Sequence, residues 1–452
     1  MRKLEKRAII CIVFAAILVI GLAIFLFRYV VDGGDWVSFP SNKHIYSDGV
    51  LSRGTVYDRD GEMLLSNEGG SVTYNDSASI RKATIHAVGD PAGNIKTGAE
   101  SAFADKLTGY NVITGTYSMS GKGRDLYLTL DADVCTVANE ALGGRGGTVG
   151  VYNYKTGDII CLVSSPNFDP NNIPDVGEDD SSGLFLNRFY SGRIVPGSIF
   201  KLVTTAAALD KMNNLSAWTY TCTGRKELGN DAITCPNPHG TVDIGEALTV
   251  SCNCAYAELT LELGGDVLAE YVDKLGLTDS RSINGIKTAK GSFNFNTDNQ
   301  ASLAWAGIGQ FEDLLNPCTM MVYMGAIANG GRAVLPQTIA KVRTSMGLPA
   351  SFPYKLWSGK MLSSDTADQL EEMMHNNVVN NYGEGNYPGL DLCAKSGTAE
   401  VGGSAEPNAW FAGFIRNPDY PLAFIVLVEN GGSGSKVAGR VANSVLQAIV
   451  NE

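Results

Sequence analysis

Ser198 and Lys201 place a potential nucleophile and a potential base three residues apart. Pro196 and Gly197 predict a helix start just before them, and the alanine-rich residues up to position 209 predict its continuation. Residues three apart lie on one face of a helix, so the hydroxyl and the amine should be neighbours. The flanking apolar side chains disfavour the ammonium form of Lys201, which leaves its amine able to take the serine proton. The segment therefore predicts nucleophilic acyl-transfer chemistry.

Two further polar segments follow in the chain order of a serine acyl-transfer site. Ser251 and Asn253 fall in a tight connection between two predicted helices, which would point both side chains toward one cleft. Residues 395–398, Lys-Ser-Gly-Thr, belong to a predicted strand in which Gly397 allows a ligand to approach the backbone closely. The first segment alone would more often be a surface lysine after a helix-starting serine. All three in this order predict an active site.

Hydrophobic patterning predicts the elements that position these residues. Short apolar runs around a turn at 154–157 predict a hairpin, helices dominate from 200 to about 328, and strands return near the C-terminus. Strands at both ends with helices between them favour an α/β (α+β) domain, in which an antiparallel sheet packs against a helical region. The predicted strands are residues 147–152, 158–164, 395–401, 409–415 and 422–429, and the predicted final helix is residues 437–450.

The N-terminus carries an uninterrupted apolar run at residues 8–27, of a length that crosses a bilayer as a helix. No small-residue cleavage site follows it, and the basic residues before it predict a cytoplasmic N-terminus. The predicted organisation is a cytoplasmic tail at 1–7, a transmembrane helix at 8–28, a small mixed stem module at 29–130 and a catalytic domain at 131–452.

The charge of the chain limits its partners. The formal net charge is −12, and because the first seven residues carry +3, the remainder carries −15. An acidic ectodomain argues against binding to nucleic acid and against tight docking on anionic lipid.

The chain contains nine cysteines, and two pairs of them lie in the predicted extracytoplasmic part. Cys222 and Cys235 flank a loop-like stretch, where a disulfide and two independent thiols are equally open readings. Cys252 and Cys254 flank Asn253 but lack the second pair that a zinc site needs, so we interpret them as small packing residues. The sequence therefore predicts no metal site.

With these motifs in order, the chain resembles the class B penicillin-binding proteins, which are peptidoglycan D,D-transpeptidases. The resemblance extends from the membrane helix to the last helix. Its departures are a short stem module, Ala394 where a glycine is common, and Phe311 after a Gly-Gln pair. The matching segments outside the three motifs are residues 53–61, 85–89, 98–100, 128–131, 164–171, 308–310, 316–317, 328–331 and 410–413.

The resemblance implies a reaction at Ser198, which attacks the carbonyl between two D-Ala residues of a peptidoglycan stem peptide. The last D-Ala leaves, and an amine from a neighbouring stem then takes the acyl group. Lys201 is the expected base for acylation. Ser251 and Lys395 are expected to pass a proton to the leaving amine, and Lys395, as a second cation, is expected to help keep Lys201 neutral. Asn253 is expected to orient the substrate amide.

Substrate binding is assigned to the Lys-Ser-Gly-Thr segment on the same grounds. The backbone N–H groups of Ser198 and Thr398 are the expected oxyanion hole, aimed at the developing negative charge. The strand edge containing Gly397 is expected to pair with the substrate backbone, while the hydroxyls of Ser396 and Thr398 hold the terminal carboxylate.

The resemblance also implies partners and a location. The substrates would be stem peptides and their lipid-linked precursor, β-lactams would be covalent inhibitors, and a membrane glycosyltransferase of the SEDS family would be a partner. No cofactor is implied. The protein would be a single-pass protein of a bacterial plasma membrane with its catalytic domain outside, serving cell shape or cell division.

Two other classes of function remain open at the level of sequence. A D,D-carboxypeptidase or a β-lactamase would share the motifs, although the membrane anchor and the stem disfavour a β-lactamase. A non-catalytic β-lactam sensor would need a cytoplasmic output that a seven-residue tail does not provide. A histidine-based triad is disfavoured because none of the four histidines lies in the three motifs, and His239 is interpreted as part of a turn.

Overall fold

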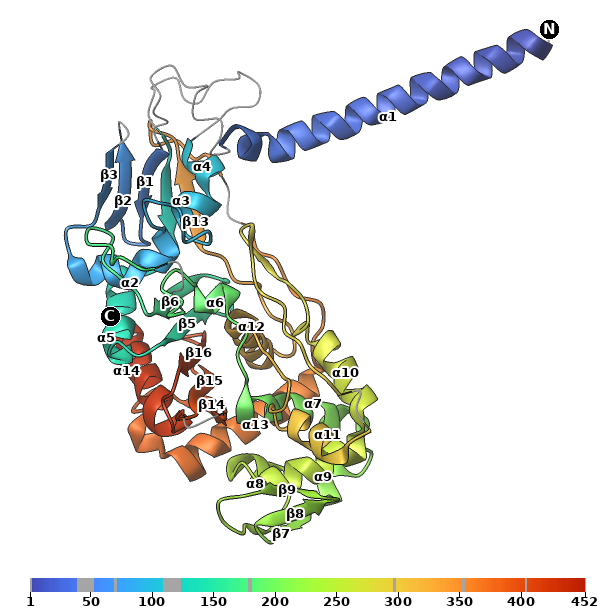
Figure 1. Ribbon diagram of the computed structural model, residues 1–452, viewed down its shortest axis with the longest axis vertical. Coiled ribbons are helices and arrows are strands. Elements are labelled where there is room, and N and C mark those ends of the chain that lie inside the picture. Colours follow the sequence, from blue (N-terminus) through green and yellow to red (C-terminus); the bar gives the residue numbers. More distant parts are fainter. Residues whose placement is uncertain are drawn as a thin grey trace.

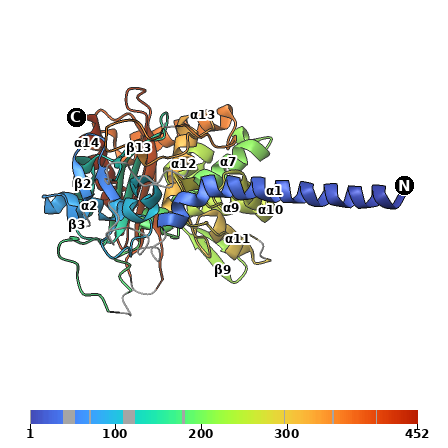
Figure 2. The same ribbon diagram turned by 90° about the horizontal axis from the view of Figure 1, so that it is seen from above.

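The fold was examined in a computed structural model, which describes residues 2–38, 53–68, 71–108, 123–177, 181–295, 298–351, 354–402 and 405–451 (Figure 1). A long N-terminal helix projects from a body built of two sheets and a helical region, as Figure 2 shows from above. The helical region and a small set of strands, β7 to β10, lie at one end of the body, and the sheet that contains β1, β2 and β3 lies at the other end.

The N-terminal helix α1 (Arg2–Ser38) contains the predicted membrane segment. Within its stretch Lys6–Val30, an 18-residue window has a mean hydropathy of 3.3, and none of that window is buried against the protein. A helix of this length and composition is suited to the hydrocarbon core of a bilayer. The structure thus contains an apolar helix over the predicted segment, and its crossing of a membrane at 8–28 stays a prediction.

The stem sheet has the strand order β13-β4-β1-β2-β3. A carboxylate at the end of β1 fixes its first turn, because Asp58 Oδ1 accepts hydrogen bonds from the backbone N–H groups of Asp60, Gly61 and Glu62. Helix α2 (Ala78–Val88) packs against β2 and extends to the catalytic domain, where it contacts α5 and β6. The strands are β1 (Arg53–Tyr57), β2 (Met63–Glu68), β3 (Ser71–Tyr74), β4 (Asp125–Leu128) and β13 (Ile339–Arg343).

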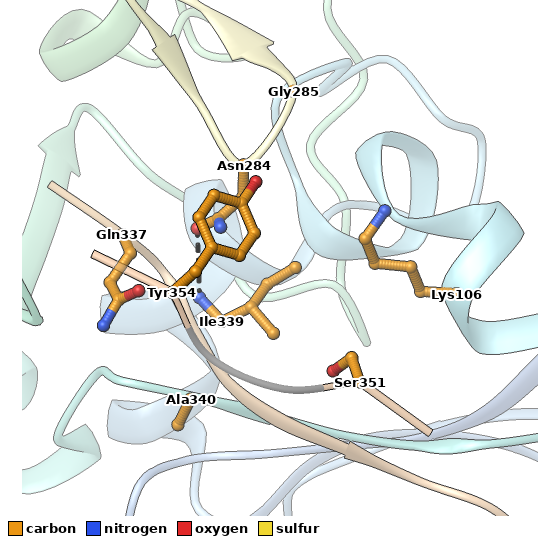
Figure 3. Close-up of a pocket in the computed structure, with 8 residues that line it drawn as sticks. All are labelled: Lys106, Asn284, Gly285, Gln337, Ile339, Ala340, Ser351 and Tyr354. Atoms are coloured by element: carbon orange, nitrogen blue, oxygen red, sulfur yellow. Dashed lines mark hydrogen bonds between the residues drawn. The ribbon is translucent and has the colours of Figure 1, made fainter. Parts of the chain in front are cut away.

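Strand β13 joins the stem although it lies far inside the predicted catalytic domain. It pairs antiparallel with β4, and the turn between β11 (Ser282–Ile283) and β12 (Ile286–Lys287) supports it. Asn284 Oδ1 in that turn accepts hydrogen bonds from the backbone N–H groups of Thr338 and Ile339, at 2.6 and 3.2 Å. Figure 3 shows this contact beside a cavity of about 260 Å³. The predicted boundary at 130/131 therefore does not separate the two sheets cleanly.

The catalytic sheet is antiparallel, with the strand order β14-β15-β16-β5-β6. All residues of β15 and β16 are buried, because α5 (Ala132–Leu142) and α14 (Gly439–Val450) cover one face and α12 (Pro317–Ala328) covers the other (Figure 1). The predicted sheet, closed by the first and last segments of the domain, is confirmed. Its strands are β5 (Gly147–Asn153), β6 (Ile159–Ser165), β14 (Leu392–Ala399), β15 (Asn408–Ile415) and β16 (Leu422–Val428).

The helical region contains the predicted helices and one departure from the prediction. Residues 220–242 form four short strands, here called the β7–β10 segment, where the sequence indicated a loop-like stretch. They are β7 (Tyr220–Cys222), β8 (Arg225–Leu228), β9 (Asp231–Thr234) and β10 (Gly240–Val242). The helices nearby are α7 (Lys201–Lys211), α8 (Ile244–Thr249), α9 (Asn253–Leu263), α10 (Gly265–Lys274), α11 (Gln300–Gly307) and α13 (Ser364–Asn377).

Candidate active site

Ser198 lies on a single 3-10 turn, η2 (Gly197–Phe200), which leads directly into α7. Gly197 has a φ of +57°, and a Cβ there would stand 2.7 Å from the carbonyl oxygen of Thr398. Only glycine combines this backbone conformation with so close an approach to β14. The indole Nε1–H of Trp410 in β15 donates to the carbonyl of Val195 at 2.9 Å. The catalytic sheet thus holds the turn that presents Ser198.

The amine of Lys201 is fully buried and lies within hydrogen-bond distance of three polar atoms. It donates to the Ser251 carbonyl at 2.8 Å, to Ser251 Oγ at 3.1 Å and to Asn253 Oδ1 at 2.8 Å. The structure records no hydrogen bond from the half-buried Ser198 hydroxyl to any described residue. Catalytic hydrogen bonds often tighten only when substrate binds, so this geometry is compatible with Lys201 as the base.

Burial sets the protonation of Lys201. Loss of hydration lowers the pKa of its amine to about 7, although the nearby thiols of Cys252, Cys235 and Cys254 oppose the shift. The amine also lies 5.2 Å from the centre of the Tyr256 ring. A substantial fraction of Lys201 is therefore neutral near pH 7, as a general base requires.

Ser251 stands between the two lysines of the site. Its hydroxyl accepts from Lys201 Nζ and from Lys395 Nζ, each at 3.1 Å. Its backbone is in the left-handed region, with a φ of +52°, a conformation that costs about 1–3 kcal/mol outside glycine. Asn253 begins α9, and its Nδ2 donates to the carbonyl of Thr234 at 3.0 Å. The prediction that Ser251 and Asn253 point into one cleft is confirmed by their shared contact with Lys201.

The environment of Lys395 bears on its predicted role as a second cation beside Lys201. It is fully buried, and its amine donates to Ser251 Oγ and to the Ser396 carbonyl at 2.9 Å. Burial lowers its pKa well below the usual range, and the positive charge of Lys201 lowers it further. Burial therefore disfavours the ammonium form of Lys395, and its role as a cation that keeps Lys201 neutral stays a prediction. The charge of Lys395 depends on what else enters the site.

Strand β14 has a free edge on the side of Ser198, because among the strands that the structure describes it pairs only with β15. The backbone N–H of Ser396 donates to the Tyr382 hydroxyl at 2.9 Å, so it points away from β15. Backbone groups alternate along a strand, which places the N–H of Thr398 on the same free edge. Thr398 is exposed, whereas Gly397 packs against Ile199 and Pro196. This edge can accept an extended substrate beside the nucleophile.

The structure brings together cysteines that the sequence left apart. Cys222 and Cys235 are free thiols with sulfurs 3.8 Å apart, well beyond the disulfide length of about 2.05 Å, so the candidate bridge is absent. Cys235 Sγ also lies 3.7 Å from Cys252 Sγ and 3.5 Å from Cys254 Sγ. Cys252 and Cys254 are buried, as predicted for small packing residues, but they also belong to this group of thiols.

His239 completes this group. Its ring nitrogen and the sulfurs of Cys222, Cys235 and Cys252 all lie within 4.8 Å of one another, a donor set that could hold a metal ion. We call these four residues the thiol–imidazole cluster. Sequence reasoning missed it because the pairs are separated in the chain. The arrangement Cys…Cys…His…Cys within residues 222–252 was the available signal.

Comparisons with known proteins identify the domain that contains the three motifs. Residues 147–447 match the family described as penicillin binding protein transpeptidase domain. The peptidoglycan D,D-transpeptidase PbpA of Mycolicibacterium smegmatis is 29% identical over 362 residues, which cover 73% of this chain and 73% of that protein. Stage V sporulation protein D of Bacillus subtilis is 26% identical over 357 residues, covering 74% of this chain and 54% of that protein.

Solved structures show the same fold. A ceftriaxone acyl-enzyme complex of penicillin-binding protein A from M. tuberculosis is similar with a TM-score of 0.77 and 24% sequence identity, covering 88% of this chain and 98% of that one. A D,D-transpeptidase domain from Eggerthella lenta is similar with a TM-score of 0.76 and 24% identity, covering 89% and 99%. The family match spans the turn of Ser198, the Ser251–Asn253 connection and strand β14, and the apolar N-terminal helix and stem fit class B. The chain belongs to the penicillin-binding protein transpeptidase family.

Proposed function

We propose that this protein is a serine-type peptidoglycan D,D-transpeptidase that β-lactams acylate at Ser198. The observation that carries the proposal is one buried hydrogen-bond network. In it Ser251 joins Lys201 to Lys395, and the network lies between the turn of Ser198 and the free edge of β14. The family membership and the names of the relatives support the same reaction class.

In the acylation step, neutral Lys201 accepts the proton of the Ser198 hydroxyl. Ser198 Oγ then forms a bond to the carbonyl carbon of the penultimate D-Ala, and the backbone N–H groups of Ser198 and Thr398 stabilise the oxyanion. The C–N bond breaks, and the terminal D-Ala leaves with a proton passed from Lys201 through Ser251. In the second step an acceptor amine attacks the ester, releases Ser198 and returns a proton to it.

The carboxylate of the substrate would supply a negative charge near Lys201 and Lys395. Among the described residues no carboxylate lies within ion-pair distance of Lys201 or Lys395. A carboxylate held by the hydroxyls of Ser396 and Thr398 would raise the pKa of Lys395 and favour its ammonium form. Such an ion pair favours the binding of stem peptides that end in a free carboxylate.

Acylation at Ser198 is tested by labelling. Full-length protein in detergent should react covalently with a fluorescent penicillin, and the Ser198→Ala variant should not. Labelling of another serine in that variant would contradict the assignment. Peptide mapping of the labelled wild-type protein identifies the site independently of the variant.

Transfer rather than hydrolysis is the second part of the proposal. A hydrolase needs a carboxylate or another base to activate water, and in the described part of the chain the Lys201–Ser251–Lys395 network includes no carboxylate. Glu400, just past the motif, is exposed. Stem-peptide or thioester substrates given with a D-amino acid should yield mainly exchange product. Mainly hydrolysis with the acceptor in excess would favour a carboxypeptidase instead.

The membrane arrangement belongs to the same proposal. The basic residues before α1 favour an N-terminus in the cytoplasm and a catalytic domain outside, where peptidoglycan is made. Protease added to intact spheroplasts should digest nearly the whole chain, and protection of the region after Arg28 would reverse the orientation. A SEDS-family glycosyltransferase partner is proposed on the family resemblance. Co-purification of the two membrane proteins would support it.

A further inference from the structure

The thiol–imidazole cluster has the dimensions of a four-coordinate metal site. Cys235 Sγ lies 3.8 Å from Cys222 Sγ and 3.7 Å from Cys252 Sγ. Tetrahedral zinc has Zn–S bonds of about 2.3 Å, which place two sulfur ligands about 3.8 Å apart. The sulfurs therefore already stand at the spacing of two edges of a zinc tetrahedron. The same distances are nearly twice a disulfide bond.

His239 gives an independent indication of a ligand. Its Nδ1 is buried and has no hydrogen-bond partner in the described part of the chain. A buried polar nitrogen left without a partner costs about 1–3 kcal/mol. One ring nitrogen of His239, Nδ1 or Nε2, lies within 4.8 Å of the three sulfurs, so a metal ion at their centre would give the imidazole a partner.

The cluster joins short strands whose other buried apolar side chains are few, namely Leu228, Ile233 and Val242. Cys222 ends β7, Cys235 follows β9, His239 precedes β10, and Cys252 is the N-cap of α9. The strands of the β7–β10 segment are only three or four residues long and about half of their residues are exposed. Small units with such limited cores are commonly held by a structural metal or by disulfides.

We infer that Cys222, Cys235, His239 and Cys252 bind one Zn²⁺ ion as a closed structural site. Three thiolates and an imidazole are soft donors that favour zinc over magnesium or calcium. Each cysteine gives up its thiol proton on coordination, and four protein ligands leave no open position for catalysis. This inference replaces our sequence-based expectation that the protein holds no metal, and it does not depend on the proposed function.

The ion would also position the active site. Cys252 stands between Ser251 and Asn253, and Cys235 follows Thr234, whose carbonyl accepts the Asn253 amide. A metal ion bound to Cys252 and Cys235 would restrain their neighbours Asn253 and Thr234, which form the hydrogen bond just described. It also restrains the left-handed backbone of Ser251, which holds the hydroxyl shared by the two lysines. Cys252 is thus a positioning residue and does not itself take part in the reaction.

The metal content of the full-length protein, purified in detergent without chelators, tests the inference. Elemental mass spectrometry should find about one zinc ion per chain. Replacement of zinc by Co²⁺ should produce an intense thiolate-to-cobalt charge-transfer band in the near ultraviolet. Protein that takes up no stoichiometric zinc after reduction and exposure to Zn²⁺ overturns the inference, whether its cysteines are then free or bridged.

Variants test the ligand set. Cys235→Ser and His239→Gln should each weaken zinc binding by about ten-fold or more, measured by competition with a chromogenic chelator. Cys318→Ala, which changes a buried cysteine of α12 outside the cluster, should retain full zinc content. Equal loss in all three variants would contradict the assignment. If a variant fails to fold, zinc removal from the wild-type protein by a chelator, followed by mass spectrometry of alkylated thiols, should expose Cys222, Cys235 and Cys252 together.

The positioning role has a separate readout. Removal of zinc from the wild-type protein should slow fluorescent-penicillin labelling of Ser198 by about ten-fold, and added Zn²⁺ should restore it. Unchanged labelling in zinc-free protein would contradict positioning. Ser198→Ala should bind zinc normally while losing all labelling, so failure of the proposed reaction and failure of the zinc site can be told apart.

Discussion

The two sides of the catalytic cleft are built in different ways. The catalytic sheet, with every residue of β15 and β16 buried, holds Ser198 and Lys395 by apolar packing and long ladders. The β7–β10 segment borders Ser251 and Asn253 with short, half-exposed strands. That segment contacts α9 through a few buried side chains such as Ile233, through polar contacts such as the ion pair of Lys226 with Glu258, and through the thiol–imidazole cluster. One half of the site therefore lies in an extended hydrophobic core, and the other is bordered by short strands with a small core and specific cross-links.

The largest expected effect comes from Lys201, which connects the two sides. Lys201→Met should lower the rate of β-lactam acylation by about 10²–10⁴-fold, because the general base is lost while the chain keeps a similar apolar stem. Stopped-flow labelling measures the rate. Lys211→Met, at the far end of the same helix with its amine on Glu270, is the matched control and should react normally. A normal rate in Lys201→Met would move the role of base to another group.

The core side should respond to loss of apolar volume. Phe411→Ala in β15 empties a fully buried position that packs against Phe424 and Tyr387, so unfolding free energy should fall by about 3–5 kcal/mol. Thermal denaturation followed by circular dichroism measures the change. Thr241→Ala, at an exposed position of β10, should change stability by less than about 0.5 kcal/mol. Similar losses of unfolding free energy in both variants would contradict the idea that the catalytic sheet depends more on apolar packing than the β7–β10 segment does.

The pH dependence of acylation reports the burial of Lys201. Its amine must be neutral to take the serine proton, and its pKa is lowered to about 7. The rate should therefore fall as pH drops below about 7, by about ten-fold for each further pH unit, and level off above it. Initial rates of labelling in a pH series measure this. A midpoint close to the ordinary pKa of a lysine would show that the site is hydrated.

The smallest expected effect tests one hydrogen bond between the sheet and the nucleophile turn. Trp410→Phe removes the donor to the Val195 carbonyl and leaves that carbonyl without its partner, which should cost about 1–3 kcal/mol of stability. Acylation should slow less than in Lys201→Met, because the base remains. Trp218→Phe, whose indole bonds to Glu262 at the surface, should be nearly neutral. A larger loss of stability in Trp218→Phe would contradict this account.

The sequence by itself determined the reactive groups and most of the elements that carry them. Ser198 and Lys201 share one turn of chain, residues 395–398 fall in one strand, and Ser251 and Asn253 share one connection, so their relations follow from local geometry. The strands of the catalytic sheet were predictable because their apolar runs are continuous and bounded by turns.

Only the tertiary structure decided which separate segments meet. It placed β13 in the stem sheet, gathered three cysteines and a histidine from the ends of short strands and the start of α9, and buried Lys395 beside Lys201, which lowers the pKa of Lys395. The physical reason is that local patterns specify periodicity and turns, whereas a pKa or a metal site depends on distances and dehydration between residues far apart in the chain. Such distances arise only when the whole core packs.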